Sequence, residues 1–285
     1  MTFTQREFMG LGPAGFHRVA YTEWGGAADS AGDLICVHGL ARNGRDFDTL
    51  AAGLADRYRV ACPDLPGRGA SDWLPVPEHY GLPLYMGDMA ALIARLGGRQ
   101  VDWVGTSLGG LIGMSLAAQP NSPIRRLVIN DIGPFVPQAG LQRIGAYVGA
   151  DPVFADMDAL EARLRDVCAP FGPLTDAQWR HLATHGGRRD GEGRLRLHYD
   201  PAIAWPYKNG AEIQDISLWP VWDAVQCPVL VLHGRESDVL LAETAQEMTR
   251  RGPMADLVEL DGIGHAPALM DPDQVRAVRD WLLAA

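Results

Sequence analysis

The feature that most constrains the fold of this chain is a set of short, nearly continuous apolar runs. They occupy residues 33–39, 58–64, 101–107, 125–131, 227–234 and 255–260. A strand buried on both faces loses its polar alternation, and such strands are typical of parallel sheets covered by helices. Helical patterns separate the runs, at residues 47–57, 84–98, 240–251 and 271–285. The alternation predicts a doubly wound α/β domain with a mostly parallel sheet.

Two regions depart from this alternation. Residues 2–8 and 16–24 are predicted to pair as strands through the glycine-rich turn between them. Residues 134–220 contain no convincing strand and several amphipathic patterns, including an apolar stripe at Met157, Leu160, Leu164 and Val167. We therefore expect an α/β core made of residues 1–133 and 221–285, with an all-helical lid inserted at 134–220.

Charge and composition limit the partners that this chain can have. It carries 25 Lys and Arg against 35 Asp and Glu, a net charge of −10. An acidic balance argues against a general affinity for nucleic acid or an anionic membrane surface, and we expect neither as a partner. The sequence has no signal-peptide pattern and no apolar run of membrane-spanning length. The four cysteines are expected to be buried free thiols, which favours a cytoplasmic location.

The run at 101–107 continues into a serine set between glycines, in the stretch "VDWVGTSLGG". No lysine follows as a phosphate-binding loop requires, and the glycine spacing does not fit a dinucleotide-binding loop. The pattern that fits is G-x-S-x-G, formed by Gly105, Ser107 and Gly109 between a buried strand and a helical pattern. This context predicts a sharp turn that presents the Ser107 hydroxyl as a nucleophile at the start of a helix.

Together with four other motifs, this turn resembles the α/β-hydrolase family over nearly the whole chain. The motifs are "HGLARNG", "DLPGRGAS", "GTSLGG", "HGRESDVL" and "GIGHAP", in the family's order. The resemblance implies the α/β-hydrolase fold with a helical lid and the activity of a carboxylesterase-like serine hydrolase. Such an enzyme cleaves small-molecule esters through an acyl-enzyme formed by a Ser-His-Asp triad, and the resemblance implies no metal or organic cofactor.

A serine hydroxyl needs a base, and the base needs a carboxylate to orient it. The resemblance places the base at His265, on the glycine-rich loop after the last strand. For the acid we favour Asp238, four residues beyond Gly234 at the end of the preceding strand. Asp131 is the competitor, because some relatives hold their acid after that earlier strand, and Glu236 is a more distant third.

Backbone amides should stabilise the oxyanion of an acyl-transfer intermediate. We expect these to be the amide of Leu108, directly after the nucleophile, and that of Leu40 in the loop after "LICVHG". Possible substrate contacts from the same loop and from the lid are Arg42, Asn43, Trp205 and Tyr207.

Other polar residues receive structural interpretations. Asp64 and Arg68 are expected to hold a turn as a charged pair, and His38 to orient the oxyanion loop. His181 and His185 lie one helical turn apart without the glutamate of an H-E-x-x-H motif, so we predict no metal site there.

Three alternatives remain open from the sequence. The same triad could serve a carbon–carbon bond hydrolase of ring-cleavage products or an enol-lactonase. A non-catalytic ligand-binding relative of the fold is a third reading. Neither the natural substrate nor the oligomeric state follows from the sequence.

Overall fold

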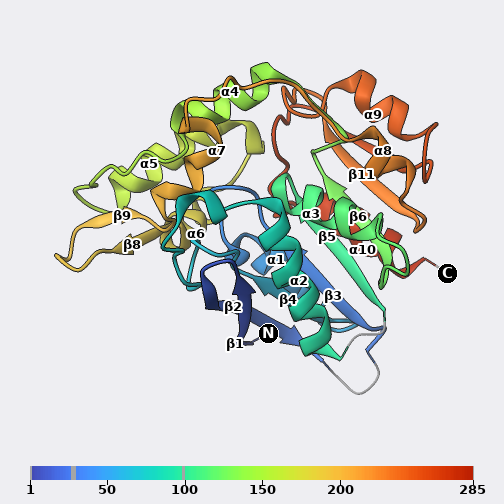
Figure 1. Cartoon of the computed structure of the whole chain (residues 1–285), viewed down its shortest axis with the longest axis horizontal. Helices are drawn as coiled ribbons and strands as arrows, with labels where there is room; N and C mark the ends of the chain where they lie inside the picture. Colours follow the sequence, from blue (N-terminus) through green and yellow to red (C-terminus); the bar gives the residue numbers. More distant parts are fainter. Residues whose placement is uncertain (1, 27–29, 98–99, 285) are drawn as a thin grey trace.

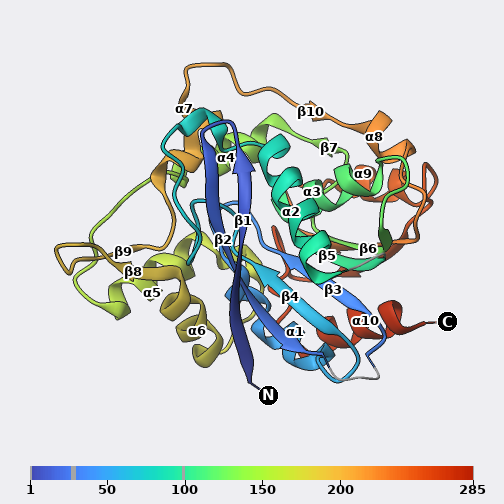
Figure 2. The ribbon, with the colours of Figure 1, turned by 60° about the horizontal axis from the view of Figure 1, so that its bottom comes forward.

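The computed structural model describes residues 2–26, 30–97 and 100–284. They form an eight-stranded sheet in the order β1-β2-β4-β3-β5-β6-β11-β12. The strands are β1 (Phe3–Gly12), β2 (Gly15–Gly25), β3 (Asp33–Val37), β4 (Arg59–Pro63), β5 (Val101–Thr106), β6 (Ile124–Asn130), β11 (Val229–Gly234) and β12 (Asp256–Leu260). From β4 to β12 neighbouring strands are parallel. The first two strands form an antiparallel hairpin at one edge (Figure 2).

Helices cover both faces of the middle of this sheet, and for that reason β3, β4, β5, β6 and β11 are buried at nearly every position. On one face, side chains such as Ile35 and Trp103 pack with α2 (Leu82–Leu96) and α3 (Leu108–Ala117). On the other, side chains such as Leu34 and Val104 pack with α1 (Asp48–Leu54) and α10 (Pro272–Leu283). The remaining core helices are α8 (Trp219–Asp223) and α9 (Ala242–Met248).

The segment between β6 and α8 lies beside the sheet, with its helices gathered at the upper left of Figure 1. It contains α4 (Gln138–Tyr147), α5 (Met157–Val167), α6 (Asp176–Gly186) and α7 (Trp205–Lys208). Leu160 and Leu164 of the predicted apolar stripe are buried with Trp179 and Leu182, so α5 and α6 share a small core of their own.

This segment is not all helical as expected. The strands β8 (Gly187–Arg189) and β9 (Leu195–Leu197) pair with each other, and β7 (Phe135–Val136) pairs with β10 (Ile216–Ser217). Strands of two or three residues are too short to show a period of two, which explains why the sequence does not reveal them. The boundaries of the lid, 134 and 220, stay a prediction.

The fold class is confirmed: this is an α/β-hydrolase fold with a mostly parallel eight-stranded sheet and an inserted helical region. Two predicted helix ends, at Gly98 and Ala285, lie outside the described residues. Among the helices of the described residues, none has the length and apolar character needed to cross a membrane.

Candidate active site

The turn between β5 and α3 places Ser107 at the carboxyl end of the sheet. Ser107 has φ 51° and ψ −115°, a left-handed backbone conformation that a non-glycine residue rarely adopts. A side chain at Gly105 would collide with the backbone of Gly109, and one at Gly109 would collide with the Val37 carbonyl. The two glycines therefore allow α3 to pack directly against the strands while Ser107 points away from them.

The Ser107 hydroxyl meets His265, which lies on the loop between β12 and α10. His265 Nε2 is 2.9 Å from Ser107 Oγ, and His265 Nδ1 is 2.8 Å from Asp131 Oδ2. Both side chains that contact the imidazole come from parallel-strand ends, because Ser107 follows β5 and Asp131 follows β6. The structure thus brings Ser107 and His265 together as the sequence predicts.

The carboxylate beside His265 belongs to Asp131. Its side chain is fully buried, and it accepts hydrogen bonds from the Gly234 amide (2.8 Å) and the Ser237 hydroxyl (2.6 Å) as well as contacting His265. These donors hold the carboxylate in place beside the imidazole. An ionised carboxylate in this position would keep a proton on Nδ1 and leave Nε2 free to accept one from Ser107.

The prediction that Asp238 orients His265 is wrong in its geometry. Asp238 forms a two-pronged ion pair with Arg143 of α4, and its side chain is 45% exposed. Burial would raise the pKa of Asp238, but the hydrogen bonds and charge of Arg143 hold that pKa below its usual value. In the loop after β11 it is Ser237, one residue earlier, that donates a hydrogen bond to Asp131.

The loop after β3 carries the predicted second amide of the oxyanion hole. The main chain at Gly39 lies next to Ser107, and Leu40 and Ser107 line the same cavities. His38 Nδ1 donates to the Gly39 carbonyl at 2.7 Å, and His38 Nε2 accepts from the Leu65 amide at 2.9 Å. Burial lowers the pKa of His38 to about 3, so the imidazole is neutral with its proton on Nδ1. The orienting role expected of His38 therefore has a direct geometric basis.

Leu108 occupies the position expected for the first oxyanion amide. As the first residue of α3, it has no carbonyl one turn earlier in its own helix to accept its N–H. The helix N-terminus also adds a positive dipole end beside Ser107.

Two cavities meet at Ser107, Leu40 and Ile144. The smaller, about 90 Å³, is also lined by Arg42, Cys168, Phe171 and Leu182. The larger, about 340 Å³, is mostly apolar and is also lined by Tyr80, Tyr85, Leu111, Ile203 and Tyr207. A nucleophile at the junction of two cavities can attack a substrate whose two halves lie on either side of the scissile bond.

The four predicted substrate contacts have different surroundings. Tyr207 lines the larger cavity, and Arg42 lines the smaller one while paired with Asp46 at 2.7 and 2.8 Å. Asn43 is buried and donates to the His185 carbonyl, so its amide supports the loop instead of facing the cavities. Trp205 lines neither cavity.

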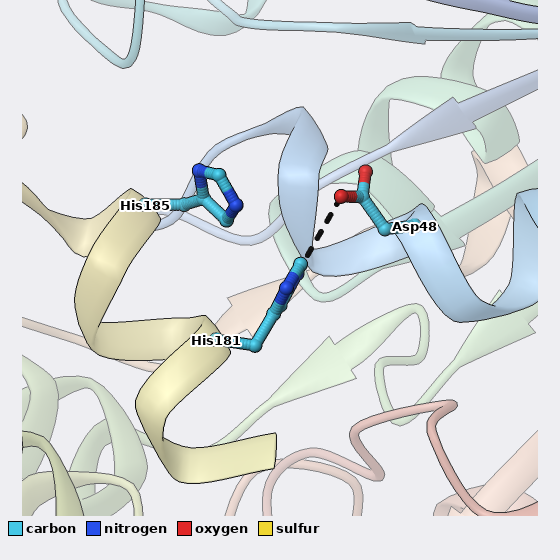
Figure 3. Close-up of side chains that lie close together, drawn as sticks. All are labelled: Asp48, His181 and His185. Atoms are coloured by element: carbon cyan, nitrogen blue, oxygen red, sulfur yellow. Dashed lines mark ion pairs between the residues drawn. The ribbon is translucent and has the colours of Figure 1, made fainter. Parts of the chain in front are cut away.

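A cluster of possible metal ligands lies between α6 and α1, where His181, His185 and Asp48 place ligand atoms within 4.8 Å of one another (Figure 3). Arg45 already donates to Asp48 through Nε at 2.9 Å, and the Arg45 carbonyl is 2.9 Å from His181 Nε2. Since Arg45 supplies the positive charge that Asp48 pairs with, this ion pair lies within the core, and His181 joins the inserted segment to it through the Arg45 carbonyl.

Comparison with known proteins shows that this chain is an α/β hydrolase. The Alpha/beta hydrolase family matches residues 34–278, and the chain belongs to this family. At 46% identity over 282 residues, covering 96% of each chain, it is similar to the 3-hydroxybutyrate-oligomer hydrolase of Cupriavidus necator. The predicted activity is confirmed at this level: the chain is an ester hydrolase.

Two further proteins similar to this chain are also named as hydrolases. The crystal structure of an α/β hydrolase from Novosphingobium aromaticivorans is 37% identical, with a TM-score of 0.85 over 97% of this chain and 96% of that one. The 2-(acetamidomethylene)succinate hydrolase of Mesorhizobium japonicum is 28% identical over 87% of each chain.

Proposed function

We propose that this ester hydrolase cleaves short oligomers of 3-hydroxybutyrate, and that Ser107, His265 and Asp131 form its catalytic triad. The observation that carries the triad is the continuous hydrogen-bonded chain from Ser107 Oγ through the imidazole to Asp131. The substrate class is supported by the 46% identity to a 3-hydroxybutyrate-oligomer hydrolase along almost the whole chain.

The first half of the reaction forms an acyl-enzyme. Ser107 Oγ attacks the ester carbonyl carbon while His265 Nε2 accepts the hydroxyl proton, and the ionised Asp131 stabilises the resulting imidazolium. The amides of Leu108 and Leu40 donate to the carbonyl oxygen as it becomes negative. The imidazolium then gives its proton to the leaving alkoxide, so the 3-hydroxyl group of one hydroxybutyrate unit is released.

The second half repeats these steps with water. His265 removes a proton from a water molecule that attacks the acyl carbon, and then returns a proton to Ser107 Oγ as the acid product leaves. We assign the acyl part and the alcohol part of the substrate to the two different cavities that meet at Ser107.

The test is release of monomer from the linear dimer and trimer of 3-hydroxybutyrate, measured by chromatography for the wild type and Ser107→Ala. We expect turnover by the wild type and a loss of at least about 10⁴-fold in the variant, because the nucleophile is removed. Equal turnover by the variant would contradict the role of Ser107. Hydrolysis of p-nitrophenyl esters without cleavage of the oligomers would contradict the substrate class and leave the triad intact.

A further inference from the structure

Arg68, at the turn after β4, is a buried cation without an acid partner. Its side chain has 0% exposure, and it donates to the Leu40 carbonyl (2.8 Å), the Pro66 carbonyl (2.7 Å) and the Tyr85 hydroxyl (2.8 Å). Its remaining nitrogen, Nη2, is buried without a hydrogen-bond partner. Among the described residues no carboxylate lies within 4.0 Å of the guanidinium.

The acid expected to neutralise Arg68 is engaged elsewhere, and so is Asp200. Asp64, predicted from the sequence to pair with it, instead accepts the amides of Gly44 and Ala70. Asp200 accepts the Tyr80 hydroxyl at 2.6 Å. A buried charge without a counter-charge is costly, so this site favours an anionic partner that the folded chain itself does not supply.

Tyr85 connects this charge to the larger cavity. Its hydroxyl oxygen accepts from Arg68, and within the described part of the chain its own proton has no acceptor. Tyr85 and Ser107 line the same cavity, whose other walls are mostly apolar side chains such as Leu111 and Ile203. When a hydroxyl oxygen accepts a hydrogen bond from a guanidinium, the O–H bond is polarised. Its proton then forms a stronger hydrogen bond than that of a hydroxyl without such a partner.

Tyr80 offers a direct contrast on the same cavity wall. Its hydroxyl donates a hydrogen bond to Asp200 and accepts one from the Leu74 amide at 2.7 Å, so both its proton and its oxygen already have partners. The charge of Arg68 also acts on a third tyrosine that lines this cavity: burial raises the pKa of Tyr207 to about 12, and the positive charge of Arg68 opposes that rise.

We propose that the Tyr85 hydroxyl, backed by the Arg68 guanidinium, is a subsite that binds a carboxylate at the end of the substrate remote from the scissile ester. This inference rests on the proposed function, since linear 3-hydroxybutyrate oligomers end in a free carboxylate. The Tyr85 proton would bond one carboxylate oxygen, and the charge of Arg68 behind it would offset the desolvation of the anion.

The experiment compares two forms of one substrate, the linear 3-hydroxybutyrate dimer as its free acid and as its methyl ester, and follows the initial rate of cleavage of the internal ester that joins the two units. For the wild type we expect kcat/KM for the acid to exceed that for the methyl ester by at least about 10-fold. Tyr85→Phe should lower this ratio to about 2 or less, mainly by raising KM for the acid, because the carboxylate lies away from the reacting atoms. Tyr80→Phe is the matched control and should keep the wild-type ratio.

Two results would overturn the subsite: a wild-type ratio near 1, or a ratio that Tyr85→Phe leaves unchanged. A fall of the same size in Tyr80→Phe would also overturn it, because the effect would then come from disturbed packing. The proposed function is tested separately by the methyl ester. Cleavage of its internal ester by the wild type and not by Ser107→Ala would sustain the role of Ser107 whatever the acid preference.

Discussion

At the scale of single residues, the surroundings of a carboxylate decide its use. Asp131 is buried, accepts from an amide and a hydroxyl, and contacts the imidazole, whereas Asp238 is half exposed and tied to Arg143. The sequence positions of both aspartates after apolar strands are compatible with a triad acid. The two aspartates are distinguished by the direction of the loop after β11, which brings Ser237 to Asp131 and turns Asp238 toward Arg143. No residue pattern in the sequence encodes that direction.

His38 gives a prediction at this scale, through the pH dependence of stability. Its pKa in the folded chain is about 3, below the ordinary 6.5, because burial disfavours the charged form. Below pH 6.5 the unfolded chain therefore binds a proton that the folded chain does not, and this contribution to stability is lost as the pH falls. Between pH 7 and pH 5 the loss is about 2 kcal/mol.

The measurement is urea unfolding of the wild type and His38→Gln at both pH values. The glutamine does not titrate, so the difference in unfolding free energy between the two proteins should shrink by about 2 kcal/mol at pH 5. A difference that stays constant would mean that the folded chain protonates His38 like a free histidine.

At the scale of elements, the strands and helices of the sheet domain are the part that the sequence predicts best. Continuous apolar runs match β3 to β6 and β11 because burial on both faces removes the alternating pattern. The run at 255–260 also forms a strand, β12, but this strand lies at the sheet edge and is only partly buried. The short pairs β7–β10 and β8–β9 could not be predicted, since their pairing depends on tertiary contacts and not on a local period.

The junction of β5 and α3 gives a prediction at the element scale. In Gly109→Ala the new methyl group would collide with the Val37 carbonyl on β3, and relieving that contact requires α3 to move. We expect a loss of about 1–3 kcal/mol in unfolding free energy, measured by denaturant titration. Gly87→Ala is the control within α2: its methyl group meets nothing within 4 Å, so we expect a gain of up to about 1 kcal/mol. Equal effects of the two substitutions would refute the close packing of α3.

At the scale of the whole molecule, the order of strands assembles the site. Ser107 and Asp131 follow neighbouring strands β5 and β6, while Asp238 follows β11, one strand further from the nucleophile. Strand order is a property of the complete fold, so the family motifs could indicate Ser107 and His265 but not choose between the two acids. The inserted segment adds cavity walls such as Ile144 and Tyr207 to the same site.

The triad is tested most directly by comparing kcat for a p-nitrophenyl ester in Asp131→Asn and Asp238→Asn. We expect Asp131→Asn to lower kcat by about 10³- to 10⁴-fold, because an amide cannot hold the imidazole in the reactive tautomer or stabilise its charge. Asp238→Asn, which breaks only a half-exposed ion pair, should stay within about 3-fold of the wild type. A large loss in Asp238→Asn with near-normal turnover in Asp131→Asn would contradict the triad of Ser107, His265 and Asp131.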